Sequence, residues 1–218
     1  MTKPLSKVIL LKDITRYSTY LVIVWVFYRF LFRFPDDIEE LVIKPIVWLL
    51  PILYFLRKEK MGLSSLGITL KNLFPSLYLS LGLGTVFVAE GLLANYLKYG
   101  SFNFGANIGA IPLLPSLGLS FATAFSEETA FRGFIFNRFS MVFKGEFAAN
   151  LLQTAIWTGI HIPAAFFVLH MSLSVGLIYL FLTAIFGFGS AFIFGKTKNI
   201  FGSVMLHVLW EWPIILFR

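Results

Sequence analysis

Two glutamates and two histidines stand inside hydrophobic stretches of the C-terminal part of the chain: Glu127, His161, His207 and Glu211. A charged residue at the centre of a membrane helix costs about 2.5–3.5 kcal/mol on insertion scales, so each needs a reason to be there. Carboxylates and imidazoles are the groups that activate water as general bases or that bind a divalent metal. The pattern therefore points to hydrolysis by an activated water, with or without a metal ion.

The segment around Glu127 also indicates how its charges are divided. On a helix, neighbouring side chains point about 100° apart, so Glu127 and Glu128 cannot serve one partner equally. Glu128 and Arg132 stand four residues apart, in the acid-then-base order that favours a helical ion pair. This leaves Glu127 to face another helix. The alternative is a helix end at the membrane surface, with all three charges in water.

Each histidine has a potential partner one helical turn away. Trp157 precedes His161 by one turn, and Glu211 follows His207 by one turn. Either histidine alone is more often a hydrogen-bonded interior residue than a catalytic one, but two histidines and two glutamates from three hydrophobic segments favour a common site. The sequence has no cysteine and no G-x-S-x-G motif, so a cysteine or serine nucleophile finds no support. The H-E-x-x-H motif of zinc metalloproteases is also absent.

The composition shows which elements must position these groups. The chain has 218 residues, of which 58% are hydrophobic and only 13% charged, and its mean hydropathy is +0.82. Soluble domains are about 45–50% apolar and about 25% charged, so we predict an all-α, multi-spanning transmembrane helical bundle. A spanning helix needs roughly 20 apolar residues, and about seven such segments, six to eight, are expected. They are Tyr17–Phe32, Ile38–Leu56 with a kink or break at its internal prolines, Phe74–Leu97, Leu113–Met141 as one long helix or two halves, Phe147–Leu169, Leu173–Phe194 and Ile200–Phe217.

The basic residues alternate from one side of these segments to the other. Lysines and arginines gather before the first segment and after the second, fourth and sixth: Lys3, Lys7, Lys12 and Arg16; Arg57, Lys58, Lys60 and Lys71; Arg138 and Lys144; Lys196 and Lys198. Cytoplasmic loops are enriched in such residues, so a multi-pass protein of the cell membrane with a cytoplasmic N-terminus is predicted. The same distribution accounts for the net charge of +7 with the lipid bilayer as partner and no nucleic acid.

No repeat, low-complexity tract or long linker divides the chain, so a single integral membrane domain over residues 1–218 is expected. Within it, residues 1–111 hold the N-terminal segments and a short connector at the membrane interface. In this connector Leu63, Leu66 and Leu70 stand at helical spacing and so predict one amphipathic face. Residues 112–213 hold the motifs described above.

The ordered set of motifs resembles one known family. Glu127-Glu128-x-x-x-Arg132, an aromatic residue one turn before a histidine, and a last histidine one turn before a polar residue occur in this order on successive hydrophobic helices. This set looks like the CPBP family, which comprises the CAAX prenyl endopeptidases and bacteriocin-processing intramembrane proteases and is also called Abi. The similarity covers roughly residues 112–213, including the Gly187-x-Gly189 stretch before the last motif. This family resemblance implies that Glu128 and Arg132 are supporting residues that anchor Glu127.

The resemblance implies an intramembrane endopeptidase that cuts a membrane-associated or prenylated protein or peptide. By this resemblance Glu127, assisted by His161, would activate the water, and His207 would stabilise the oxyanion. Glu211 would assist His207, although the family usually has Asn or Asp at that position. Trp157 would be a supporting residue in place of the more common Phe. The resemblance favours a mechanism without a cofactor.

Three alternatives use the same residues. Glu127, His161 and His207 also suit a divalent metal such as zinc, with an open position for water. A family member that has lost proteolysis would act as a membrane scaffold or immunity factor, and such a loss would account for Glu211. A transporter would use buried glutamates and histidines for proton or metal relay. It would need a path past the bilayer midplane, whereas a protease needs one cavity that collects Glu127, His161 and His207.

Overall fold

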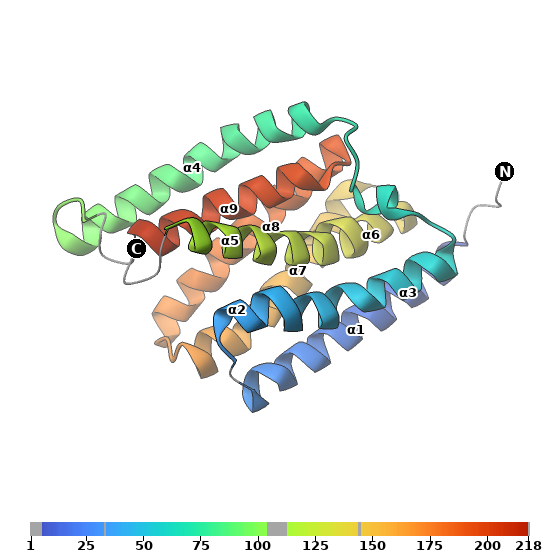
Figure 1. Cartoon of the computed structure of the whole chain (residues 1–218), viewed down its shortest axis with the longest axis horizontal. Coiled ribbons are helices and arrows are strands. Elements are labelled where there is room, and N and C mark those ends of the chain that lie inside the picture. The colour runs from blue at the N-terminus through green and yellow to red at the C-terminus, as the bar shows by residue number, and fades with distance from the viewer. Residues whose placement is uncertain (1–5, 33, 104–112, 144, 218) are drawn as a thin grey trace.

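The computed structural model of the chain describes residues 6–32, 34–103, 113–143 and 145–217. Within these ranges the regular structure is helical, and the long helices cross the molecule beside one another (Figure 1). The boundary expected between residues 111 and 112 lies outside the described residues, as do Lys3 and Lys144 of the basic loops.

Seven continuous helices make up the described bundle, and each coincides with one of the expected segments. Four are regular: α1 (Lys7–Leu31), α4 (Leu73–Tyr99), α8 (Leu173–Thr197) and α9 (Ile200–Phe217). The other three contain wide π-helical turns. One runs through α2 (Asp36–Ile38), η1 (Glu39–Ile43), η2 (Pro45–Leu49) and α3 (Leu50–Glu59). The next runs through α5 (Leu113–Glu128), η4 (Thr129–Phe136) and α6 (Asn137–Val142), and the last through α7 (Glu146–Pro163) and η5 (Ala164–Val168).

The wide turns have a local cause in two of these helices. A proline inside a helix removes one N–H donor and crowds the preceding turn, and a π-turn is one way to absorb that crowding. Pro45 opens η2, and Pro163 immediately precedes η5. The kink or break expected in the second segment is therefore taken up as a widened but continuous helix. The fourth segment is likewise one long helix rather than two halves.

The connector before α4 differs from the expectation. It forms a short 3₁₀ turn, η3 (Leu63–Leu66), which ends at Gly67 with a φ of 79°. Leu66 is buried, whereas Leu63 and Leu70 are exposed, so the predicted single amphipathic face is wrong. The reason is that Leu66 is pressed against Gly133 of η4, where an added Cβ would come within 2.8 Å of the Leu66 carbonyl oxygen.

The surface of the bundle is that of a membrane protein. Three described helices are long and apolar enough to cross a membrane by length and composition: Leu73–Leu97, Glu146–Val168 and Leu173–Thr197. Large apolar side chains also project outward, for example Tyr78, which is 69% exposed, and Phe181, which is 66% exposed. A soluble monomer rarely shows extensive apolar surface of this kind. The fold is therefore an all-α helical membrane bundle, as predicted.

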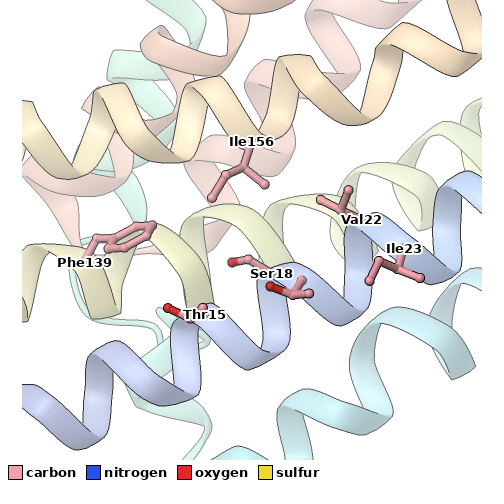
Figure 2. Close-up of a pocket in the computed structure, with 7 residues that line it drawn as sticks. Thr15, Ser18, Val22, Ile23, Phe139 and Ile156 are labelled. Atoms are coloured by element: carbon pink, nitrogen blue, oxygen red, sulfur yellow. The ribbon is translucent and has the colours of Figure 1, made fainter.

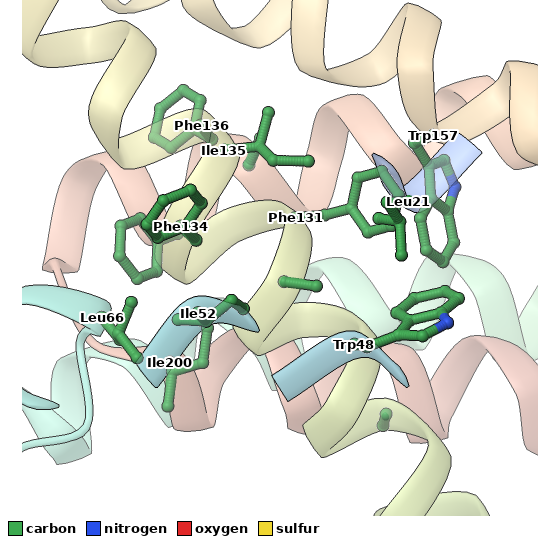
Figure 3. Close-up of a cluster of buried hydrophobic side chains, with 14 of the residues drawn as sticks. Leu21, Trp48, Ile52, Leu66, Phe131, Phe134, Ile135, Phe136, Trp157 and Ile200 are labelled. Carbon is green, nitrogen blue, oxygen red and sulfur yellow. The ribbon is translucent and has the colours of Figure 1, made fainter. Parts of the chain in front are cut away.

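Aromatic side chains fill the centre of the bundle (Figure 3). Phe131 of η4 meets Trp157 of α7 edge to face, with 4.9 Å between ring centroids, and Trp48 of η2 with 5.8 Å. Each of these three side chains is at most 1% exposed. Phe134 and Phe136 continue the same core along η4 toward α6. This core, which we call the aromatic core, directly follows the Glu127-Glu128 pair along the helix and holds α1, η2, η4 and α7 in place.

Candidate active site

Glu127 lies near the end of α5 and faces the helix that contains η1 and η2. Its Oε1 accepts a hydrogen bond from Lys44 Nζ at 2.7 Å, and its Oε2 lies 3.9 Å from His207 Nε2. Lys44 also forms an ion pair with Glu40 one turn earlier on its own helix. Its ammonium group lies 5.5 Å from the centroids of both the Trp25 and Trp48 rings. Glu127 thus faces another helix, as predicted, and meets a buried lysine there.

Glu128 points the other way and binds α8 and α9. The ion pair with Arg132 forms as predicted, at 3.0 Å. Glu128 Oε1 also accepts a hydrogen bond from His207 Nδ1 at 2.8 Å, and its Oε2 accepts one from Ser190 Oγ at 2.6 Å. Glu128 and Arg132 were expected to anchor Glu127, but in this arrangement Glu128 holds His207, and Arg132 holds Glu128. The helical rotation between adjacent residues is the cause, because it directs the two carboxylates to different neighbours.

His161 is fixed by its own helix. Its Nδ1 lies 2.7 Å from the Trp157 carbonyl oxygen. Because a carbonyl only accepts, Nδ1 carries the proton, and the lone pair of the neutral ring is on Nε2. The Trp157 ring lies 4.5 Å from the His161 ring between centroids and donates through Nε1 to the Thr183 carbonyl at 3.2 Å. Trp157 thus holds His161 in one orientation and one tautomer.

Gly187 of α8 allows this arrangement to close. A Cβ at this position would come within 2.8 Å of the Trp157 ring, so a larger residue would displace the indole. The Gly187 carbonyl also accepts a hydrogen bond from Arg132 at 3.2 Å. The guanidinium of Arg132 lies 4.6 Å from the Trp157 ring centroid. Gly187, from the Gly187-x-Gly189 stretch singled out in the sequence, therefore packs against Trp157 and binds Arg132.

A cavity of about 350 Å³ collects the polar groups of this region. Glu127, His161 and Glu211 line it, together with Lys44 and Glu40. His207 lies behind this wall and is 3% exposed. Glu211 Oε2 is buried without a hydrogen-bond partner. The structure thus brings all four predicted catalytic residues to one place. Glu127, His161 and Glu211 line the cavity, whereas His207 lies behind it, next to Glu127 and Glu128.

Among the lining residues that sequence reasoning missed are Lys44, which binds Glu127, and Glu40, which binds Lys44. Both stand in the second segment, which was judged by its apolar length and its prolines. A signal was present, because Lys44 is an ionisable residue in the middle of an apolar run and falls under the same rule that singled out Glu127 and His161. The pairing of Lys44 with Glu127 across 83 residues of sequence could not be inferred from any local spacing.

A second cavity of about 370 Å³ is similar in size but differs in the residues that line it (Figure 2). It lies between α1, α6 and α7 and is lined by hydroxyl and apolar side chains, among them Thr15, Ser18, Phe139 and Ile156. No ionisable side chain lines it. The two cavities are therefore distinguished by the ionisable side chains that line only the first, and not by their size.

The predicted metal ligands are engaged elsewhere in this arrangement. Among the described residues, no group of three or more His, Asp or Glu side chains is placed to hold a metal ion. The Lys44 ammonium occupies Glu127 Oε1, and Glu128 occupies His207 Nδ1. A cation bound to a carboxylate repels a second cation at the same oxygen. The arrangement as it stands does not fit a three-ligand zinc site.

Comparison with known proteins identifies the C-terminal half of the chain. Residues 109–213 match the family model described as Rce1-like, type II CAAX prenyl endopeptidase Rce1-like. No curated protein and no solved structure was found to match the chain. The matched range contains Glu127, His161, His207 and Glu211, whereas Lys44 and Glu40 lie outside it. Over residues 109–213, just under half of the chain, the sequence is therefore similar to the Rce1-like family of CAAX-type proteases that its motifs resembled.

Proposed function

We propose that the protein is an intramembrane endopeptidase that hydrolyses a peptide bond of a membrane-associated substrate with a water activated by Glu127. The observation that carries this proposal is the shared cavity of Glu127 and His161, in which His161 presents the Nε2 lone pair and Glu127 presents an oxygen that Lys44 does not occupy. General acid–base catalysis requires such groups within hydrogen-bond reach of one water.

The proposed reaction assigns one step to each group. Glu127 Oε2, assisted by His161 Nε2, takes a proton from water while the water oxygen attacks the scissile carbonyl carbon. The tetrahedral oxyanion is stabilised by His207, which donates from Nε2 when both ring nitrogens carry protons. Glu128 supplies the counter-charge for that state at 2.8 Å. Glu127 then returns its proton to the leaving nitrogen as the C–N bond breaks.

Lys44 has a positioning role in this scheme. Its bond to Oε1 fixes the rotation of the Glu127 carboxylate and leaves Oε2 directed toward His207, 3.9 Å away. Glu40 shares the ammonium, so the charge of the lysine is compensated within the wall of the cavity. Glu211 lines the same cavity, and we assign it an orienting role for His207 one turn earlier on α9.

The transporter alternative receives less support. A transporter needs a continuous path past the midplane of the membrane. The aromatic core fills the space beyond Glu127, and its members Trp48, Phe131 and Trp157 are essentially unexposed. The cavity lies toward the end of the bundle where α1 ends and the next helix begins. A cavity bounded by this packed core favours a site at which a substrate is held and cut.

The metal-dependent alternative is tested by chelation. Because Lys44 and Glu128 already engage the predicted ligands, we expect activity of the purified protein in detergent or vesicles to persist after dialysis against a zinc chelator. Loss of activity on chelation, with recovery when zinc is returned, would favour the metal mechanism. The protein would be multi-pass in the cell membrane in either mechanism.

The proposal is tested by profiling peptide termini in membranes that contain the wild-type chain or Glu127→Gln. This change keeps the shape of the side chain and removes the base. The matched control is Glu146→Gln, since Glu146 is exposed and paired with Lys198 at the far end of the bundle. New termini should appear with the wild type and Glu146→Gln but not with Glu127→Gln. Identical profiles from three folded, equally abundant proteins would favour a scaffold.

A further inference from the structure

Among the described residues, the two ends of the helical bundle differ strongly in their content of lysine and arginine. The N-terminus of α1, the α3–α4 connection, the end of α6 and the α8–α9 connection lie at one end, which we call the basic end. Cations at the basic end are Lys7, Lys12, Arg16, Arg57, Lys58, Lys60, Lys71, Arg138, Lys196 and Lys198, against the carboxylates of Asp13, Glu59 and Glu146. The opposite end carries Asp36, Asp37, Glu39, Glu40 and Glu211, against Arg29, Lys44 and Lys98.

This asymmetry orients the bundle in a membrane. Short cytoplasmic loops carry an excess of lysine and arginine because such loops are not translocated. Helix direction alone would allow either orientation, but each basic cluster lies on the same side of the bundle once the helices are packed (Figure 1). The basic end is therefore the cytoplasmic end.

The site cavity lies in the other half of the bundle. Trp25 and Arg29 come from the last turns of α1, and Asp36 and Glu40 from the first turns of the next helix. Leu169 follows η5, so it too lies at the end away from the N-terminus. Asp36 and Leu169 are exposed, and the cavity reaches the surface beside them.

Access from the basic end is closed by packed side chains. The aromatic core separates Glu127 from α6, and the buried guanidinium of Arg138 lies beyond it. Arg138 is bound to Glu59 at 2.9 Å and to the Ser65 carbonyl at 2.9 Å. A substrate segment would have to break both layers to reach Glu127 from the cytoplasm.

We propose that the site takes polypeptide segments from the side of the membrane opposite the cytoplasm. Its substrate class is then a membrane-anchored or membrane-bound polypeptide whose scissile bond has been exported, rather than a peptide presented at the cytoplasmic surface. The identification of a polypeptide as the substrate rests on the proposed proteolytic function. The direction in which the cavity opens does not depend on that function.

The absence of cysteine from the sequence makes the test direct. Two conservative single substitutions, Ser174→Cys and Ser64→Cys, place one thiol at each end of the bundle. Both serines are exposed; Ser174 lies at the start of α8, beside the cavity end, and Ser64 lies in η3, at the basic end. The full-length protein is expressed in cells, and a membrane-impermeant maleimide is added before or after the cells are broken.

We expect Ser174→Cys to be labelled in intact cells and Ser64→Cys to be labelled only after the cells are broken. Labelling of Ser64→Cys in intact cells, alone or together with Ser174→Cys, would overturn the proposal. So would a lack of labelling at Ser174→Cys in intact cells when broken cells label it. Labelling of both positions in broken cells establishes that both thiols are reachable in the folded protein.

A second readout separates this inference from the proposed function. The termini that depend on Glu127 are mapped onto the topology of the proteins that bear them. Cleavage points on exported segments support the inference, and cleavage points on cytoplasmic segments overturn it. If labelling follows the expected pattern while no Glu127-dependent terminus appears in any host, the proteolytic function fails and the orientation of the cavity stands.

Discussion

Two buried ion pairs join the N-terminal helices to the helices that match the family, and they differ in what surrounds them. Arg138 pairs with Glu59 at 2.9 Å near the basic end, and Glu127 pairs with Lys44 at 2.7 Å at the cavity. Both pairs connect segments about 80 residues apart in sequence. Neither residue of the first pair lines either of the two cavities described above, whereas Lys44 and Glu127 of the second pair both line the cavity of about 350 Å³.

The hydrogen bonds of the two pairs explain the difference. Arg138 donates to Glu59, to Ser65 and to the Gly133 carbonyl, so its planar group is surrounded by acceptors. Glu127 has one oxygen bound to Lys44 and the other 3.9 Å from His207, beyond hydrogen-bond distance. Arg138 is thus a satisfied buried charge that fixes the fold, although Glu59 Oε1 has no hydrogen-bond partner. Glu127 instead has a spare lone pair that faces a cavity and is available for chemistry. Four substitutions test this comparison.

The largest effect is expected for Glu127→Gln. General acid–base catalysis contributes about 10²–10⁴-fold to a rate, so the rate at which Glu127-dependent termini appear should fall by about that factor. The thermal unfolding temperature should fall less than in Arg138→Met, since Gln keeps the shape of the side chain and Glu40 still compensates the Lys44 ammonium. Unfolding and cleavage are measured on the same purified sample. A variant that cleaves at the wild-type rate would contradict the assignment of Glu127 as the base.

Arg138→Met should have the opposite profile. Removing one partner of a buried ion pair costs about 3–5 kcal/mol, because the other charge stays buried. We expect a marked loss of stability against denaturant and a normal cleavage rate per folded molecule at low temperature. The double variant Arg138→Met with Glu59→Met should regain part of the stability. The comparison between the two pairs would break if Arg138→Met stayed stable but lost cleavage.

Lys44→Met should fall between these two cases, because Lys44 both compensates buried carboxylates and positions one of them. Contacting residues show coupling energies of about 0.5–3 kcal/mol in double-mutant cycles. We therefore expect Lys44→Met to destabilise the wild type more than it destabilises Glu127→Gln. Lys44→Arg, which keeps the charge, should restore more cleavage than Lys44→Met. Additive effects of Lys44→Met and Glu127→Gln on stability would argue against the pairing.

The smallest effect is expected for Glu211→Gln. Loss of an oxyanion donor typically costs about 10²–10³-fold in rate, but a glutamine amide can donate a hydrogen bond at any pH. If Glu211 only orients His207, the cleavage rate should stay within about tenfold of the wild type. A loss as large as that of Glu127→Gln would instead give Glu211 a direct role as an acid or base. The measurement is the same rate of terminus formation.

The helices themselves were predictable from the sequence to a large extent. Apolar length and loop charge predicted seven segments, and seven helices are present in the described residues. The prediction failed in the connector, where Leu66 is buried and Leu70 is exposed. Spacing alone assumed an α-helix there, but close packing against Gly133 selects a 3₁₀ turn.

For the site, the sequence determined only those contacts that form within a single helix. The Glu128–Arg132 ion pair and the contact of Trp157 with His161 both join residues four apart, so the helical repeat places them together without help from the rest of the chain. The order of the motifs along the chain was likewise enough to indicate the family that residues 109–213 match.

Only the tertiary structure decided which helices these residues meet. Glu128 binds His207 across 79 residues of sequence, and Lys44 binds Glu127 across 83. Such pairings depend on the rotation of each packed helix about its axis, and no local spacing carries that information. The same packing gathers every basic loop at one end and places the cavity at the other. The sequence therefore supplied the chemical groups, and the packing of the helices decided their partners and the end of the bundle at which their cavity lies.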